Sequence, residues 1–330
     1  MRFEVTDEAA ALRDAAASLL SGEVTAEVVR AGWPGGDVAL VDAAWRKLAG
    51  VGVVGTLVGE DAGGLALDEN SLVPLLVEIG RSGLPVPAVE TIAVAAPLLG
   101  LAGDPRLPAV LAGELTVAAE LDGSGLVPFG ARAGLVVLRD GDGLRVYDAS
   151  ELTLTPEVTV DGSRALARVT GRGTGTALAG DVESAWLRGV LGTSALLVGL
   201  SRRMLDLTVG YVKGREQYGV PIGSFQAIKH MLANALVAVE FAAPTVLAAG
   251  WSQATGAPDA ADRTSAAKVL ASDAARLVAR TAIQCHGAMG YTTEYDLHLF
   301  VKRAWALAPS WGDPARHRAR LAVSLGVADV

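Results

Sequence analysis

Two segments of this 330-residue chain contain residue types that could bind an anion. The first is 215–226, REQYGVPIGSFQ, in which an arginine precedes a Gly/Pro-rich turn and Phe225 and Gln226 open the next apolar stretch. A guanidinium donates paired hydrogen bonds to a phosphate, and the free N–H groups of a helix N-terminus attract the same charge. The spacing therefore indicates a phosphate site at Arg215. A tight helix–helix turn with a solvated arginine has the same pattern, so both interpretations stay open.

The second segment is 284–291, QCHGAMGY, which also joins two apolar helical stretches. Gly287 and Gly290 would let the backbone approach a flat or bulky group, although a helix C-cap followed by a turn uses the same glycines. His286 has the side chain of a general base, but a single histidine in a turn more often orients a neighbour through a hydrogen bond. The segment alone does not decide between a ligand site and a turn.

Long amphipathic helices must hold these segments. Beyond about residue 184, apolar residues recur every three or four positions, which predicts an antiparallel four-helix bundle. The four stretches are 197–211, 225–239, 270–281 and 297–308. In the first third, the pattern predicts helices over 8–20, 41–48, 68–81, 89–101 and 105–112, the first of them capped by Thr6.

The middle of the chain has a different pattern. Residues 116–178 contain short β-like runs separated by Asp-Gly turns, which predict a small antiparallel sheet. The predicted fold class is therefore mainly α with a small β domain. We expect a helical N-terminal domain over 1–115, a small middle β domain over 116–180 and a C-terminal four-helix bundle over 181–330.

Composition excludes several classes of protein. Acidic residues outnumber basic ones 36 to 28, which argues against nucleic-acid binding. Cys285 is the single cysteine and the 4 histidines lack ligand spacing, so we expect no metal site. The apolar stretch 235–249 contains Glu240 and Pro244, and the N-terminus lacks the order of a signal peptide. We therefore expect a cytoplasmic protein that does not span a membrane.

Taken together, the two segments resemble signatures of the acyl-CoA dehydrogenase family. Residues 215–226 are similar to its R-x-Q-F-G-x-P-I-x-x-F-Q signature, and residues 284–295 to Q-x-x-G-G-x-G-Y-x-x-E-Y. Weaker matches at 60–65, 78–87 and 107–114 extend the resemblance over nearly the whole chain. It implies the family's three-part fold: an N-terminal helical domain, a β-barrel-like middle domain, here reduced, and a C-terminal four-helix bundle.

In this family an FAD lies between two subunits, with its ring in one and its pyrophosphate and adenine end against the bundle of the other. The resemblance implies that Arg215 binds the pyrophosphate. It also implies that further cofactor contacts come from Gln217, Tyr218, Phe225, Gln226, Gln284, His286, Gly287 and Ala288. Ala288 replaces the second glycine of the family signature, a change of one methyl group.

The family's reaction removes the α proton of an acyl-CoA thioester with a carboxylate base and passes the β hydride to the flavin. Members place this glutamate at one of two positions, which the resemblance puts at Gly312 and Gly189. Glycine cannot accept a proton, so we predict that this chain has no catalytic base. Residues 118–123 are also followed by a shortened segment without the family's flavin-ring elements.

These departures resemble the non-catalytic subunit of actinobacterial α2β2 acyl-CoA dehydrogenases that act on steroid side-chain CoA thioesters. The resemblance implies a homologous catalytic partner that binds most of the acyl-CoA, a shared FAD and an electron-transfer acceptor protein. Two alternatives stay open. One is a self-sufficient homo-oligomeric dehydrogenase with a displaced base, Asp313 or Glu183. The other is a structural subunit without flavin.

Overall fold

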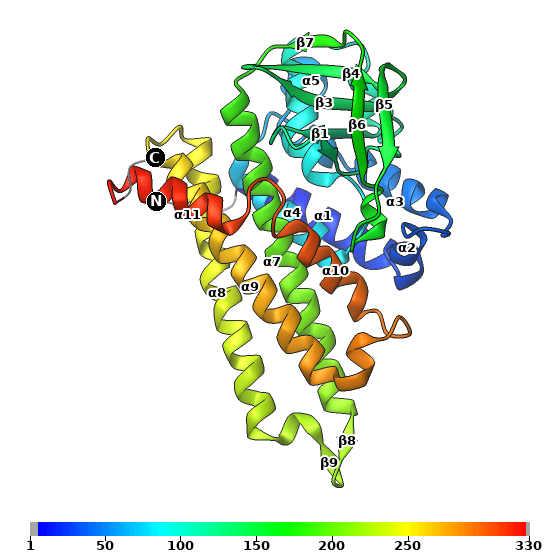
Figure 1. Cartoon of the computed structure of the whole chain (residues 1–330), viewed down its shortest axis with the longest axis vertical. Coiled ribbons are helices and arrows are strands. Elements are labelled where there is room, and N and C mark those ends of the chain that lie inside the picture. Colours follow the sequence, from blue (N-terminus) through cyan, green and yellow to red (C-terminus); the bar gives the residue numbers. More distant parts are fainter. Residues whose placement is uncertain (1–5, 328–330) are drawn as a thin grey trace.

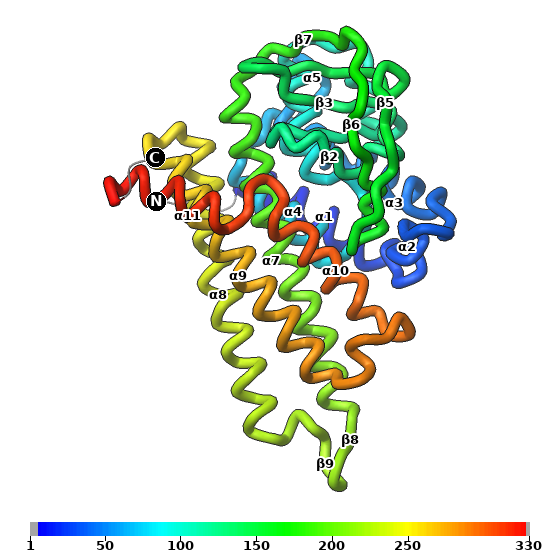
Figure 2. The backbone as a smooth tube through the Cα atoms, in the orientation of Figure 1, coloured from blue at the N-terminus to red at the C-terminus, as the bar shows by residue number. Residues whose placement is uncertain are grey.

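The computed structural model describes residues 6–327 as three packed regions (Figure 1). Small sheets lie at one end of the long axis, a helical bundle extends to the other end, and N-terminal helices pack where the two meet. The backbone tube shows that the chain returns from the bundle toward the sheets before its last helix (Figure 2). The predicted fold class, mainly α with a small β region, is confirmed.

The N-terminal region is helical, as predicted. Its helices are α1 (Asp7–Glu23), α2 (Ala26–Ala31), α3 (Val38–Gly50), α4 (Glu69–Ser82), α5 (Ala96–Ala102) and α6 (Leu107–Leu111). The predicted cap of α1 is confirmed, because the Thr6 hydroxyl accepts the Ala9 N–H at 3.2 Å. Residues Val89–Ala95, expected to be α-helical, form a π-helical segment that leads into α5. The periodicity missed α2, which is shorter than two turns.

The middle region contains two sheets rather than one. The first has the order β1-β3-β4-β7 and consists of β1 (Val117–Glu120), β3 (Leu135–Asp140), β4 (Gly143–Asp148) and β7 (Thr176–Leu178). The second has the order β2-β6-β5 and consists of β2 (Leu126–Val127), β6 (Ala167–Arg172) and β5 (Leu152–Pro156). The prediction of one antiparallel sheet is wrong, because β1 pairs with β3 in parallel. A long connection through β2 joins those two strands, so no tight turn forces them to be antiparallel.

The C-terminal region is built on the four predicted helices. They are α7 (Val182–Gly214), α8 (Gln226–Ala254), α9 (Ala260–His286) and α10 (Leu297–Leu307), followed by α11 (Pro314–Ser324). A two-stranded hairpin, β8 (Glu216–Gln217) and β9 (Val220–Pro221), joins α7 to α8. The sequence of α11 has arginines at three positions and shows no clear apolar stripe, so periodicity did not find it.

Close contact between α4 and α7 joins the N-terminal helices to the bundle. A Cβ atom on Gly199 would lie 2.0 Å from the Val77 carbonyl oxygen, and one on Gly80 would lie 2.4 Å from that of Leu196. Only glycine permits helix backbones to approach so closely. The two regions therefore share one apolar core, and α7 is held in a fixed position against α4.

Helix α8 is apolar but poorly covered. Among residues 6–327 it is the one helix whose length and composition would suffice to cross a membrane, a criterion that packed helices also meet. It continues through Glu240 and Pro244. One side packs on α7 and α9. The outer side exposes Leu236, Val237 and Phe241, the last of them 69% accessible.

Candidate functional site

The two predicted cofactor segments lie at the same end of the bundle, beyond α7 and α9 (Figure 1). Tyr211, one turn before Arg215, stacks on the imidazole of His286 with 4.2 Å between ring centroids. Its hydroxyl donates a hydrogen bond to the His286 carbonyl oxygen at 3.4 Å, and the Arg215 N–H donates to the Tyr211 carbonyl oxygen at 2.9 Å. The structure therefore connects the two segments through the contact between Tyr211 and His286.

The first segment is an exposed hairpin that projects from the bundle. Its five predicted contact residues, Arg215, Gln217, Tyr218, Phe225 and Gln226, are all exposed. Tyr218 and Gly219 both have positive φ, at 54° and 76°, which is typical of a tight two-residue hairpin turn. The rings of Tyr218 and Phe225 meet edge to face at 6.4 Å. Within residues 6–327 no carboxylate pairs with Arg215, so its guanidinium is available to a phosphate from outside the chain.

The second segment combines a buried histidine with an open backbone. His286 is 3% exposed, and its Nδ1 lies 2.7 Å from the Ala282 carbonyl oxygen, so Nδ1 carries the proton. Its Nε2 is buried and has no partner in the described part of the chain. Burial lowers the pKa of His286, so the ring is neutral at pH 7. This geometry favours an orienting role over general-base chemistry.

The residues around His286 face outward. Gln284, Gly287 and Ala288 are exposed. Gly287 has φ of 58°, and a Cβ atom there would meet nothing within 4 Å. An unpaired arginine, an open glycine and an imidazole nitrogen without a partner fit the pyrophosphate and adenosine end of FAD. Arg215 would bind the pyrophosphate there.

One of the two predicted base positions lies directly against an indole ring, and the other follows that tryptophan in the chain. A Cβ atom on Gly189 would lie 2.4 Å from the ring of Trp311. Gly312 follows that tryptophan directly, and a Cβ atom there would lie 2.8 Å from His317 Nε2. The space in which a carboxylate on α7 would begin is therefore filled by Trp311. The sequence indicated both glycines but not the approach of the Trp311 ring to Gly189.

Two buried basic residues hold the turn that carries Trp311. Lys268 donates to the Ala308 carbonyl oxygen at 2.6 Å. His317 Nε2 donates to the Trp311 carbonyl oxygen at 2.9 Å, and its Nδ1 accepts from the Ser265 hydroxyl at 3.2 Å. Burial lowers the pKa of Lys268 to about 7 and that of His317 to about 4. These contacts hold Trp311 at φ 57°, a conformation that bulky residues rarely adopt.

Sequence reasoning did not select Lys268 or His317. Both residues are 0% exposed. Lys268 lies on α9, which periodicity describes only by its apolar residues, and His317 lies on α11, which periodicity did not find. A lysine within the apolar stripe of α9 was the one available signal, because an unpaired lysine is seldom fully buried.

The two candidate displaced bases do not face the reaction region. Asp313 caps α11, because its carboxylate accepts the Arg316 N–H at 2.8 Å. Glu183, at the start of α7, forms an ion pair with Arg320. Both carboxylates are exposed and neither lines the nearby cavity.

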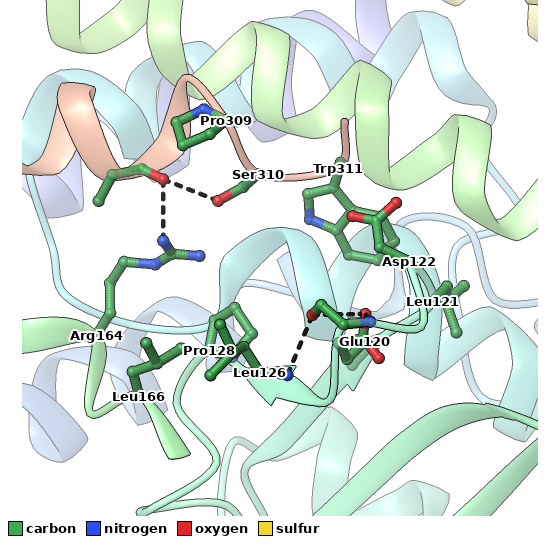
Figure 3. A pocket seen from close by; sticks show the side chains of 13 residues that line it. Glu120, Leu121, Asp122, Leu126, Pro128, Arg164, Leu166, Pro309, Ser310 and Trp311 are labelled. Atoms are coloured by element: carbon green, nitrogen blue, oxygen red, sulfur yellow. Dashed lines mark hydrogen bonds between the residues drawn. The ribbon is translucent and has the colours of Figure 1, made fainter. Parts of the chain in front are cut away.

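That cavity, of about 280 Å³, lies between the middle region and the turn after α10 (Figure 3). Glu120, Asp122 and Arg164 contribute charged groups to its wall, and Trp311 forms part of its upper side. The resemblance places the flavin-ring elements in this region, and the residues present do not supply them. The chain therefore fits FAD at the far end of the bundle and departs from the family at the reaction end.

Known proteins similar to this chain agree with that fold. The family described as acyl-CoA dehydrogenase, C-terminal domain, matches residues 185–325. Acyl-CoA dehydrogenase IpdE2 of Mycolicibacterium smegmatis is 31% identical over 323 residues, which cover 96% of this chain and 98% of the relative. The crystal structure of the ChsE4-ChsE5 complex from Mycobacterium tuberculosis superposes with a TM-score of 0.84 at 21% identity, with both chains covered completely. The Tcur3481-Tcur3483 steroid ACAD G363A variant superposes with a TM-score of 0.85 at 24% identity, covering 98% and 99%.

Proposed function

The chain belongs to the acyl-CoA dehydrogenase family, and from that premise we propose that it is the non-catalytic subunit of a heteromeric, FAD-dependent acyl-CoA dehydrogenase. It completes the pyrophosphate and adenosine end of an FAD whose ring is held by a homologous catalytic subunit. The observation that carries the proposal is the contact of Trp311 with Gly189, which leaves no room for a side chain, and so for a base, at that position of α7. When bound, the FAD accepts the hydride.

The region around Gly189 and Gly312 supports this assignment also through the lack of a chemical group that could act as the base. Abstraction of an α proton needs a carboxylate within hydrogen-bond reach of the substrate carbon. Gly189 and Gly312 provide no side chain, and the carboxylate of Asp313 is engaged as a helix cap. Glu183 is engaged in an ion pair with Arg320. None of the four positions proposed for a base, Gly189, Gly312, Asp313 and Glu183, therefore presents a free carboxylate.

The cofactor end supports a role in binding. Arg215 and Gln217 project from a hairpin whose base is closed by the Ile222 N–H, which donates to the Arg215 carbonyl oxygen at 2.8 Å. That bond fixes the backbone of Arg215 and leaves its guanidinium free to bind a ligand. A charge-assisted pair with a pyrophosphate is roughly twice as strong as a neutral hydrogen bond. The residues thus have the chemistry to bind the anionic part of an FAD from a second chain.

A second chain is also favoured by the outer face of the bundle. Large apolar side chains are exposed there on two neighbouring helices, namely Leu236, Val237 and Phe241 on α8 and Leu270 and Leu277 on α9. Exposed large apolar side chains on neighbouring helices favour contact with another protein or a membrane. A homologous subunit accounts for this face and for the open cofactor end together, as in an α2β2 assembly.

The class of substrate follows from the similar proteins. The Tcur3481-Tcur3483 neighbour is a steroid acyl-CoA dehydrogenase, and the ChsE4-ChsE5 neighbour is a complex of two different chains. We therefore extend the proposal to the CoA thioester of a steroid side chain, bound mainly by the partner. A cytoplasmic location and an electron-transfer protein as acceptor belong to the same proposal.

The test compares Arg215→Ala with Arg46→Ala in the complex that co-purifies with the chain. Arg46 is an exposed arginine on α3, in the N-terminal region. Loss of a hydrogen bond to a charged group costs about 1.5–3 kcal/mol, so the FAD dissociation constant should rise by about tenfold or more in Arg215→Ala only. Full retention of FAD by Arg215→Ala would remove this residue from the cofactor site.

A further inference from the structure

We infer that the cavity beneath Trp311 binds a small neutral molecule with an apolar body, a carbonyl oxygen for Arg164 and an N–H or O–H donor for Glu120. The inference goes beyond the proposed function and does not depend on the FAD contacts at the other end of the bundle. It assigns a ligand site to a region that the family's chemistry no longer occupies in this chain.

Arg164 is a buried donor that lacks acceptors. Its side chain is among the charged groups of the interior, at 6% exposure. Nη1 donates to the Ala306 carbonyl oxygen at 3.1 Å, whereas Nη2, the other terminal nitrogen, forms no hydrogen bond within residues 6–327. Figure 3 shows the guanidinium directed toward the space below Ser310. A buried donor without an acceptor costs about 1–3 kcal/mol, so a ligand oxygen in this space would be stabilised.

The charge of Arg164 is already balanced within the protein. Burial lowers the pKa of Arg164, the nearby carboxylates of Glu90 and Asp161 oppose that shift, and the Arg303 cation adds to it, so two carboxylates and two guanidinium groups share this part of the interior. Both carboxylates belong to the buried charged residues of the interior. A further negative charge is therefore not needed, and the group that Arg164 lacks is a neutral acceptor such as a carbonyl oxygen.

Glu120, across the cavity from Arg164, offers a hydrogen-bond acceptor and so favours a ligand N–H or O–H (Figure 3). It is 6% exposed, and its Oε1 accepts both the N–H and the hydroxyl of Ser124, each at 3.1 Å. No hydrogen bond to Oε2 is formed within residues 6–327, so that oxygen can accept a donor from a ligand. Asp122, in contrast, is engaged by Trp186 and Arg316 at 2.7 and 2.9 Å.

The space between these two polar groups is apolar and limited in size. Its walls include Leu121, Leu126, Leu166, Pro309 and Trp311. A dry apolar cavity of about 150 Å³ admits benzene. The cavity here, about 280 Å³, therefore has room for a substituted six-membered ring with one polar group toward each end.

The probe is 4-hydroxybenzamide, which has a carbonyl acceptor at one end and a hydroxyl donor at the other. Its binding to the purified full-length chain is measured by calorimetry and by saturation-transfer NMR, with toluene as the matched molecule lacking both polar groups. We expect 4-hydroxybenzamide to bind about tenfold more tightly than toluene, because only it pairs with Arg164 and Glu120. Equal binding of the two molecules, or no binding of 4-hydroxybenzamide, would overturn the inference.

Two filling variants locate the bound molecule. Leu126→Trp and Leu166→Trp each place a larger ring in the cavity without changing its charges, and Leu101→Trp is the control on the exposed surface of α5. Binding should be lost in the first two and kept in the control. Retained binding in a folded filling variant would contradict the assignment, and the second variant serves if the first does not fold.

Riboflavin separates this inference from the proposed function. If riboflavin displaces 4-hydroxybenzamide, the cavity is a flavin-ring site, and both the ligand class and the non-catalytic assignment are wrong. If 4-hydroxybenzamide fails to bind while Arg215→Ala still lowers FAD retention in the complex, only the cavity inference is overturned.

Discussion

The clearest consequence of the buried turn concerns protonation of His317. This imidazole is fully buried, stacks on Trp186 with 5.4 Å between ring centroids, and donates Nε2–H to the Trp311 carbonyl oxygen. Its pKa is lowered from 6.5 to about 4, mainly by burial and also by the cationic groups of Lys268 and Arg320, while the hydrogen bond to the Trp311 carbonyl oxygen opposes the shift. Protonation of His317 in the folded state would place a second positive charge beside Lys268. It would also remove the lone pair with which Nδ1 accepts the hydrogen bond of the Ser265 hydroxyl.

The sign of the pH effect follows from the lowered pKa. Between pH 6.5 and 4 the unfolded chain takes up a proton at this histidine and the folded chain does not, so stability falls as the pH falls through this window. Above pH 6.5 the contribution is fully present, and below about pH 4 no further loss occurs. The lowering from 6.5 to about 4 corresponds to about 3 kcal/mol of unfolding free energy.

The perturbation is His317→Gln, which retains an N–H donor and does not titrate. Urea unfolding is followed by tryptophan fluorescence at several pH values between 4.5 and 7, with His230→Gln as the control at an exposed histidine. We expect the His317→Gln chain to lose about 3 kcal/mol less than the wild type on acidification. The same pH dependence in the His317→Gln and wild-type chains would refute the reasoning that this residue is buried and neutral.

Three further substitutions test other contacts. Gly189→Ala should destabilise the chain by about 1–3 kcal/mol through overlap with the indole, and Trp311→Ala in the same chain should relieve most of that cost in unfolding experiments. Arg303→Met removes the buried ion-pair partner of Asp161. It should lower the free energy of unfolding by about 3–5 kcal/mol and so lower the melting temperature. An unchanged melting temperature would contradict this expectation. Asp313→Asn keeps a capping side chain, so turnover of the purified complex should not change, whereas a large fall would restore the displaced-base alternative.

The helices were largely predictable because their periodicity reflects the core they share. The stripe at 197–211 lies within α7 as predicted, and the cap at Thr6 and the break after Ser82 follow local rules. The parallel pairing of β1 with β3 was not predictable, since strand alternation does not specify the direction of a partner.

The candidate site likewise has one part that the sequence predicts and one part that only the structure shows. Arg215 and Gln284 belong to contiguous signatures, so the sequence alone predicts a cofactor role for them, and the structure joins their segments through Tyr211 and His286. The contact of Trp311 with Gly189 and its support by Lys268 involve residues far apart in the chain. No local pattern encodes such contacts, because they depend on how α7, α9 and the turn after α10 pack.

The central claim is tested most directly by counting flavin and measuring acyl-CoA oxidation for the chain purified alone and with its partner. The account predicts a colourless, inactive chain when alone, and one FAD for each pair of unlike chains in an active complex. Stoichiometric FAD together with acyl-CoA oxidation by the chain alone would contradict it.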